Sequence, residues 1–275
     1  MKLALTLLAV AGLASHAFAE ELKIVAAENF YGSVAEQIAG SSATVTSILS
    51  NPNQDPHEFQ TNAETAKAVA DADIIIYSGI GYDDWMDKLL GVQGKDSRTV
   101  IRVSDLIGAK DGDNPHIWYN PKTMPALATK LGDVLKNPAT ATQFINSLKP
   151  LTEKIAELKK KTAGIKVTAT EPVFGYMAAA LGFEMLNYDY QLAVMNDTEP
   201  SFKQVADFED SLKSKTAKIL FYNRQVTDPS TSKMESLAKD NDVPIVGVTE
   251  TQPLDQKTYL EWMLSELSGV EKALP

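Results

Sequence analysis

Two of the three histidines in the 275-residue chain lie in the same local setting. One lies in Asp55-Pro56-His57-Glu58-Phe59 and the other in Asn114-Pro115-His116-Ile117-Trp118, so each follows a proline and precedes an aromatic residue by two positions. Proline fixes its own φ and holds the preceding residue extended, so each imidazole should project from a stiff loop. A stiff loop loses little freedom when a metal ion binds. We therefore predict that His57 and His116 ligate one divalent metal; the alternative is two ordinary histidines in proline turns.

Glu171 and Glu250 are the candidate oxygen ligands. Each follows a short apolar, β-branched run, 165–168 for Glu171 and 245–248 for Glu250. Charge balance around a divalent ion calls for carboxylates beside the two imidazoles. In open parallel sheets, ligands bind beyond the carboxyl ends of the strands, where both glutamates are expected. The alternative for each is a solvated loop acid or a charge in the first turn of a helix.

Apolar, β-branched runs alternate along the chain with segments of 3.6-residue periodicity. The runs expected as strands are 22–26, 43–49, 74–77, 100–103, 165–168, 219–222 and 245–248, and the periodic segments include 63–72, 84–90, 201–212 and 232–238. This alternation predicts an α/β fold with parallel sheets covered by helices. His57 follows one of these strands and His116 another, so we expect both at the same edge of the first sheet.

Residues 121–161 interrupt the alternation, because they contain helical periodicity and no strand pattern. A first helix is expected from 121 to about 135, and a second over 139–161, with Pro150 as the place where it would kink. We predict two parallel-sheet α/β lobes, residues 20–137 and 164–275, joined by one long rigid helix over 138–163. No Gly/Ser-rich linker separates the lobes, so they should not be loosely tethered.

The first 19 residues have the pattern of an export signal. Met1-Lys2 is followed by an apolar stretch and by Ala17-Phe18-Ala19, a small-x-small cleavage site before Glu20. The absence of cysteine excludes disulfides, thiolate ligands and a lipid-modified cysteine, which favours a free protein in a bacterial periplasm. The net charge of −10 and the absence of a basic patch disfavour nucleic acid and anionic membranes as partners.

The chain resembles the metal-binding solute-binding proteins of bacterial ABC importers, the zinc and manganese receptor group. The resemblance extends over nearly the whole mature chain. The segments that carry it are 27–31 (AENFY), 53–59 (NQDPHEF), 72–75 (ADII), 79–85 (GIGYDDW), 114–121 (NPHIWYNP) and 171–176 (EPVFGY). The two Pro-His motifs at this separation are the specific part of the pattern.

This resemblance implies one metal buried in a cleft between two lobes that a rigid helix joins. By match, His57, His116 and Glu171 are ligands, and Glu250 is the fourth. The family more often has Asp in a differently spaced loop at the fourth position, which makes Asp255 the fallback. Many relatives carry Asp at the positions of Asn114 and Asn120, so the resemblance does not indicate which residues form hydrogen bonds with His116. Tyr31, Phe59, Trp85, Trp118 and Tyr176 would line the cleft or pack the lobes.

Two neutral imidazoles and two carboxylates bring a charge of −2 to the site, which neutralises a divalent cation. This ligand set suits Mn²⁺ or Fe²⁺ and accepts Zn²⁺. The His-rich loop that the resemblance associates with zinc-dedicated relatives is absent. We therefore predict manganese first, zinc second and iron third, with one ion carried per chain as transported ligand.

The predicted function is that of a monomeric periplasmic solute-binding protein, not an enzyme, which delivers the metal to an ABC permease in the inner membrane. A secreted metal-dependent hydrolase is the first alternative, if only His57, His116 and Glu171 bind and water takes the fourth position. Gly-x-Ser-x-Gly, Walker and His-Glu-x-x-His motifs are absent, however. A metal-binding adhesin is the second alternative.

Overall fold

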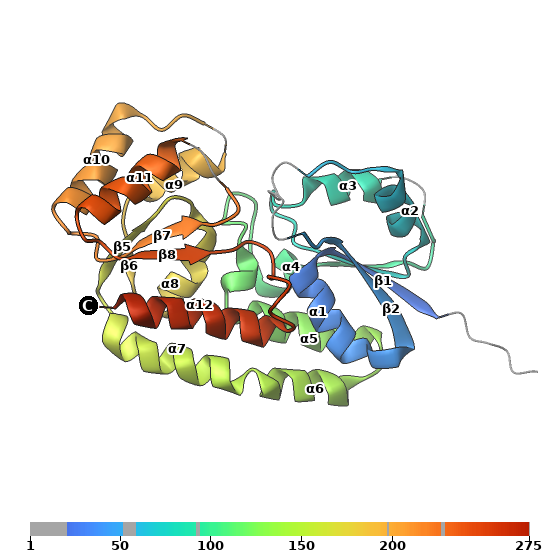
Figure 1. Ribbon diagram of the computed structural model, residues 1–275. Helices are drawn as coiled ribbons and strands as arrows, with labels where there is room; N and C mark the ends of the chain where they lie inside the picture. Colours follow the sequence, from blue (N-terminus) through green and yellow to red (C-terminus); the bar gives the residue numbers. More distant parts are fainter. Residues whose placement is uncertain (1–20, 52–58, 92–93, 197, 227–228, 275) are drawn as a thin grey trace, which may run out of the picture.

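The computed structural model describes residues 21–51, 59–91, 94–196, 198–226 and 229–274. They form two lobes, each built on a four-stranded parallel sheet with helices on both faces (Figure 1). The first sheet has the order β2-β1-β3-β4 and the second the order β6-β5-β7-β8. The strands are β1 (Leu22–Glu28), β2 (Ala43–Leu49), β3 (Ile74–Tyr77), β4 (Thr99–Arg102), β5 (Lys166–Ala169), β6 (Glu184–Met185), β7 (Leu220–Asn223) and β8 (Ile245–Val248). The prediction of two parallel-sheet α/β lobes is confirmed, and only the two-residue edge strand β6 lacked a recognisable strand pattern.

Helices cover both faces of each sheet. In the first lobe these are α1 (Asn29–Ala39), the 3₁₀ turn η1 (Gly40–Ser42), α2 (Ala63–Asp71), α3 (Asp84–Leu90), α4 (Val103–Ile107), η2 (Ile117–Tyr119) and α5 (Thr123–Val134). In the second lobe they are η3 (Pro172–Phe174), α8 (Gly175–Ala180), α9 (Tyr188–Met195), α10 (Phe202–Lys213), α11 (Pro229–Asp240) and α12 (Tyr259–Ala273). Among the described residues, no helix is long and apolar enough to cross a bilayer.

Local capping explains where several helices begin. The Asn62 side chain accepts a hydrogen bond from the backbone of Thr65 at the start of α2, and Thr258 does the same for Glu261 in α12. Ser201 and Gln204 form a reciprocal capping box at the start of α10. Each cap satisfies a backbone N–H that the helix itself leaves unpaired, which places the helix start at that residue.

The segment between the lobes forms two helices, not one continuous helix. These are α6 (Pro138–Ser147) and α7 (Lys149–Thr162), and they are separated at Leu148. Pro150 lies in the first turn of α7, where its missing N–H costs no hydrogen bond; inside a continuous helix it would break the ladder. In Figure 1 the two helices run along one side of both lobes, α6 beside α5 and α7 beside α12.

One hydrophobic core extends from the first lobe into the second. Phe30 of α1 stacks on Trp118 with ring centroids 4.7 Å apart and lies 5.8 Å from Trp262 of α12. Tyr119 lies 5.6 Å from Trp262 and 5.3 Å from Phe174. These five rings are fully or almost fully buried. Because separating the lobes would expose this aromatic surface to water, the interface favours a fixed arrangement of the two lobes.

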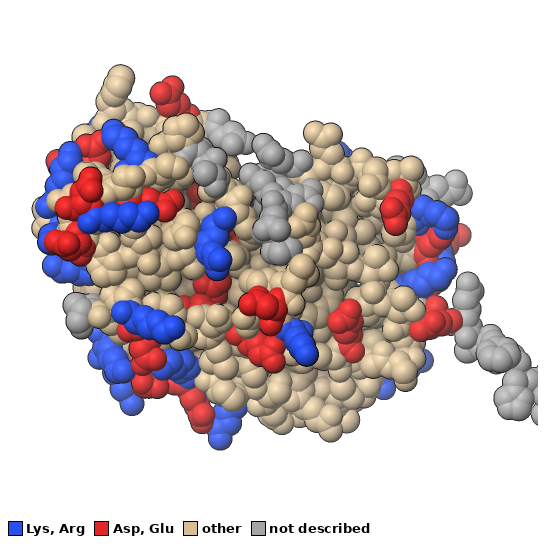
Figure 2. All heavy atoms as spheres, viewed as in Figure 1, with Lys and Arg blue, Asp and Glu red and all other residues tan. Residues whose placement is uncertain are grey.

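Charged side chains are mixed in sign over the visible surface. Figure 2 shows Lys and Arg interspersed with Asp and Glu over the second lobe and α7. Several form ion pairs, such as Lys154 with Glu271 (2.7 Å) and Lys233 with Glu209 (2.7 Å). On this face there is no continuous basic patch of the kind that nucleic-acid binding needs.

Candidate metal site

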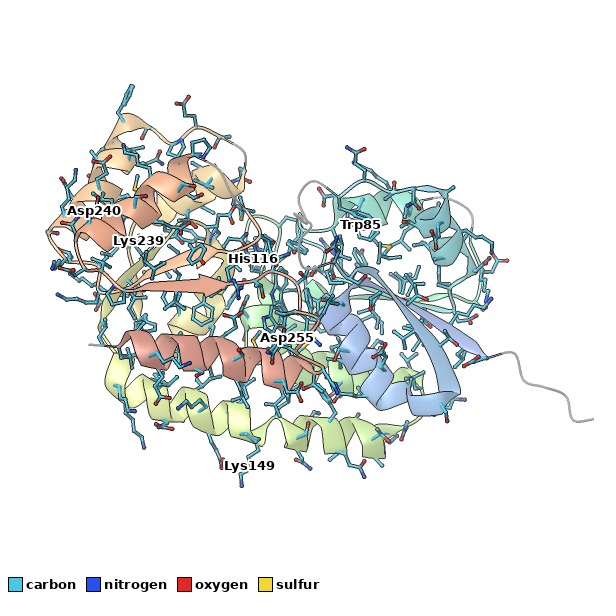
Figure 3. All side chains as sticks on the ribbon, viewed as in Figure 1. Trp85, His116, Lys149, Lys239, Asp240 and Asp255 are labelled. Atoms are coloured by element: carbon cyan, nitrogen blue, oxygen red, sulfur yellow. The ribbon has the colours of Figure 1, made fainter. Side chains whose placement is uncertain are left out.

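His116 lies at the junction of the two lobes (Figure 3). It directly precedes η2, and its side chain is fully buried. Nδ1 lies 2.7 Å from Asn114 Oδ1, and Nε2 lies 3.5 Å from Glu250 Oε2, which belongs to the second lobe. The histidine therefore presents one ring nitrogen to a local partner and the other to a carboxyl group from the opposite lobe.

The two predicted glutamates come from neighbouring loops of the second lobe. Glu171 follows β5 by two residues, and Glu250 follows β8 by two residues. Both are buried, with exposed fractions of 5% and 0%. Asn223, the last residue of β7, joins them: its Nδ2 donates to Glu171 Oε2 (2.6 Å) and to Glu250 Oε1 (2.5 Å). The carboxyl ends of three parallel strands thus bring the two carboxyl groups together.

The Glu250 loop is held from both sides. Gln225 Oε1 accepts hydrogen bonds from the backbone of Glu250 (2.6 Å) and Thr251 (2.9 Å). From the first lobe, Tyr82 donates its hydroxyl to Glu250 Oε2 (3.0 Å), and Tyr119 donates to the Thr249 carbonyl (2.7 Å). Burial and the Glu250 carboxyl raise the pKa of Tyr82 well above its ordinary value, so this hydroxyl keeps its proton and acts as a donor.

The remaining predicted ligand, His57, and the fallback residue, Asp255, are not part of this group of described side chains. His57 lies outside the described residues. Asp255 is exposed and lines a surface cavity of about 640 Å³ together with Arg224, Glu266 and Lys272. In Figure 3, Asp255 is well separated from His116. Among the described residues, no three His, Asp or Glu side chains form a complete metal-binding group. Among the predicted ligands, the structure brings His116, Glu171 and Glu250 to one place, where Asn223 and Tyr82 link them.

A second pair of acids is buried beside Tyr82. Glu28 ends β1 and is fully buried beside Asp83. Asp83 accepts hydrogen bonds from the backbone of Ser78 (2.6 Å) and Gly79 (2.7 Å). Burial and the neighbouring Asp83 raise the pKa of Glu28 well above its ordinary value, and burial also raises the pKa of Asp83. Two buried carboxyl groups side by side favour a shared proton over two charges.

The five aromatic residues predicted near the metal have different roles. Trp118 packs edge-on against His116, with ring centroids 5.3 Å apart. Tyr176 donates its hydroxyl to the Asn114 carbonyl (3.0 Å). Phe59 and Trp85 pack on each other at 4.7 Å, and Tyr31 is fully buried with its hydroxyl against Ser78. Tyr82, which was not among the five, also packs against His116, at 5.9 Å.

Sequence reasoning missed Asn223, Tyr82 and the Glu28–Asp83 pair. Asn223 and Glu28 each end a parallel strand, so the rule that located Glu171 and Glu250 would have found them too. Tyr82 and Asp83 follow a turn in which Gly79, Ile80 and Gly81 all have positive φ (76°, 49° and 88°). A non-glycine residue such as Ile80 rarely adopts this conformation, so the sequence does not reveal where the turn directs Tyr82.

Comparison with solved structures identifies the class of fold. The periplasmic zinc binding protein TroA from Treponema pallidum superimposes with a TM-score of 0.76 over 93% of this chain and 99% of its own, at 17% sequence identity. The chain therefore shares the fold of this protein over nearly its whole length.

Sequence comparison identifies the family. Residues 24–273 match the family model described as ZnuA, zinc-uptake complex component A, periplasmic, and the chain belongs to this family. It is 27% identical to the manganese ABC transporter substrate-binding lipoprotein PsaA of Streptococcus anginosus, with 93% of this chain and 90% of the relative covered. It is 25% identical to the iron ABC transporter substrate-binding lipoprotein MtsA of Streptococcus pyogenes, with 90% and 88% covered.

Proposed function

We propose that this protein captures a divalent transition metal outside the cytoplasm and delivers it to the membrane permease of an ABC importer. The observation that carries the proposal is the meeting of His116 from one lobe with Glu250 from the other, 3.5 Å apart and fully buried. Buried carboxyl groups are costly unless a cation or hydrogen bonds compensate them. A divalent ion between His116, Glu171 and Glu250 would supply that compensation.

The proposed ligands are His57, His116, Glu171 and Glu250. The buried position of Glu250 beside His116 supports it as fourth ligand over Asp255, which is exposed and lines a different cavity. Two imidazoles and two carboxylates bind Mn²⁺ or Fe²⁺ well and accept Zn²⁺, so we propose manganese first and zinc second. The proteins that this chain resembles are named for manganese, iron and zinc, which supports a divalent transition metal as the ligand.

We further propose that the mature protein begins near Glu20, acts as a monomer in the periplasm and has no catalytic activity of its own. The family is one of substrate-binding components, which supports a binding role over a hydrolytic one. The two curated relatives are lipoproteins, whereas this sequence contains no cysteine to carry a lipid. Cell fractionation of the native protein would test the location.

The decisive experiment combines metal analysis with ligand variants. Protein purified without added metal should contain about one equivalent of manganese or zinc, and competition between Mn²⁺ and Zn²⁺ should give the preferred ion. His57→Ala, His116→Ala, Glu171→Ala and Glu250→Ala should each weaken binding strongly, because each removes one of four ligands. Asp255→Ala is the matched control, since it removes an exposed acid from the same loop as Glu250 and should bind normally.

Two outcomes would change the assignment. Full-strength metal binding by His57→Ala would contradict the proposed set of four ligands. Full-strength binding by Glu250→Ala together with loss in Asp255→Ala would transfer the fourth position to Asp255. Hydrolysis of generic esters or phosphates by the metal-loaded protein would favour an enzyme instead.

A further inference from the structure

Asn114 contacts both lobes at the metal site. Its Oδ1 accepts hydrogen bonds from the backbone N–H of His116 (3.1 Å) and lies 2.7 Å from His116 Nδ1. Its Nδ2 donates across the lobe boundary to the carbonyl of Pro172 (2.7 Å), the residue directly after Glu171. One amide therefore touches the ligand from the first lobe and the loop that carries a ligand from the second.

The neighbours of Asn114 determine which end of its amide is oxygen and which is nitrogen. The Pro172 carbonyl can only accept, so the atom facing it must be the NH₂ group. The backbone N–H of His116 can only donate, so the atom facing it must be the oxygen. That oxygen also faces Nδ1, and it can bond to the neutral ring only if Nδ1 carries the hydrogen. Nε2 is then left with its lone pair, on the side of the ring where Glu250 lies.

Two further contacts hold Asn114 in place. Tyr176 of α8 donates its hydroxyl to the Asn114 carbonyl (3.0 Å). Gly175 lies so close that a Cβ at this position would be 2.8 Å from Asn114 Nδ2. A larger residue at 175 would therefore displace the Asn114 amide from this position.

We propose that Asn114 is a positioning residue that fixes His116 in the Nδ1–H tautomer and braces the His116 loop against the Glu171 loop. An aspartate at this position would still accept from Nδ1, and as an anion it would make the imidazole a stronger ligand. It has no hydrogen to give to Pro172, however, and its second oxygen would face that carbonyl. Asparagine at this position therefore makes His116 a weaker ligand than aspartate would, but its NH₂ group links the two lobes through the hydrogen bond to Pro172.

The effect on metal affinity rests on the proposed function, whereas the effect on the tautomer does not. Loss of a residue that orients a metal-bound histidine typically weakens binding about 10- to 100-fold. Asn114→Ala removes both the acceptor for Nδ1 and the bridge to Pro172, so it should show this full loss. Asn114→Asp keeps the acceptor for Nδ1 and removes the bridge to Pro172, so it should keep the Nδ1–H tautomer.

The test measures both properties in the same set of proteins. Ring ¹⁵N shifts of metal-free protein, recorded where the imidazole is neutral, report the tautomer of His116, whose signals are identified by their loss in His116→Gln. Calorimetry or chelator competition with Mn²⁺ alone and Zn²⁺ alone gives the affinities. We expect one pure Nδ1–H tautomer in the native protein and in Asn114→Asp, and a mixture of tautomers in Asn114→Ala with affinity reduced about 10- to 100-fold.

Asn120→Ala is the matched control. Asn120 also precedes a proline and lies four residues after His116, but its side chain only accepts from the backbone of Lys122 (3.1 Å). In Asn120→Ala, the tautomer of His116 and the affinity for Mn²⁺ and Zn²⁺ should equal those of the native protein. A pure Nδ1–H tautomer in Asn114→Ala would overturn the proposal even if affinity fell. A tautomer that depends on Asn114 in a protein that binds neither metal would uphold the positioning role and refute the metal-binding function.

Discussion

Glu266 of α12 allows a quantitative prediction of stability against pH. Its carboxyl group is buried, and Oε1 accepts hydrogen bonds from Trp262 Nε1 (3.1 Å) and from Thr249 Oγ1 (3.4 Å), next to Glu250. Burial raises the pKa of Glu266 from 4.5 to about 7, against opposing hydrogen bonds and the Arg224 charge. Each pKa unit corresponds to about 1.4 kcal/mol, so the ionised carboxylate costs the folded state about 3 kcal/mol.

The sign of the pH dependence follows from linkage. A carboxyl group whose pKa is higher in the folded state binds its proton more tightly there, so folding is favoured at low pH. This contribution is fully present below pH 4.5, is lost as the pH rises to about 7, and stays lost above about pH 8. Glu266→Gln keeps the shape and the acceptor oxygen but cannot ionise. The variant should therefore match the native protein near pH 4.5 and exceed its stability by about 3 kcal/mol at pH 8 and above.

Urea unfolding of metal-free protein in chelator, at pH values from 4.5 to 9, would measure this difference. In thermal unfolding, 3 kcal/mol corresponds to a rise in Tm of roughly 6–12 °C for a chain of this size. Glu261→Gln is the control: it removes an exposed acid from the first turn of the same helix but keeps an oxygen that can accept from the Lys257 N–H (2.7 Å), so it should change stability by less than about 1 kcal/mol. Parallel curves for Glu266→Gln and the native protein across the whole range would refute the reasoning.

Three further predictions concern metal binding and the second acid pair. Mn²⁺ or Zn²⁺ at 1,000-fold above Kd should stabilise the protein by about 4 kcal/mol and raise Tm by several degrees, reversibly with chelator; a Tm that no divalent ion changes would contradict a metal receptor. Metal affinity should fall as the pH drops, because His57 and His116 must be neutral to ligate, and chelator competition at pH values from 5 to 8 measures this; an affinity that stays constant over this range would contradict histidine ligands. Because burial and Asp83 raise the pKa of Glu28, its contribution to stability is lost as pH rises, so Glu28→Gln should raise Tm more at pH 8 than at pH 5. An equal Tm change at both pH values would show that Glu28 does not titrate in this range.

The sequence alone was sufficient to predict the two parallel-sheet α/β lobes and the position of two candidate ligands at strand ends. Strands and helices each have a characteristic local pattern of apolar residues in the sequence. Seven of the strands were therefore recognisable from runs of apolar, β-branched residues. The rule that parallel strands end at a common edge then led to Glu171 and Glu250. The prediction of one long linking helix, with at most a kink at Pro150, was wrong, because the structure has two helices separated at Leu148.

The contacts between the lobes needed the folded structure. Glu250 lies 134 residues from His116 along the chain, and no local pattern indicates that Glu250 meets the histidine while the nearby Asp255 faces solvent. The donors that orient the carboxyl groups, Asn223 and Tyr82, are ordinary residues until packing brings them to the site. Asn114 bonds to Pro172, 58 residues away, only because a buried aromatic core holds the lobes together. The periodicity of apolar residues depends only on residues that are close in the sequence. The distances between side chains of the two lobes depend instead on how the lobes pack against each other.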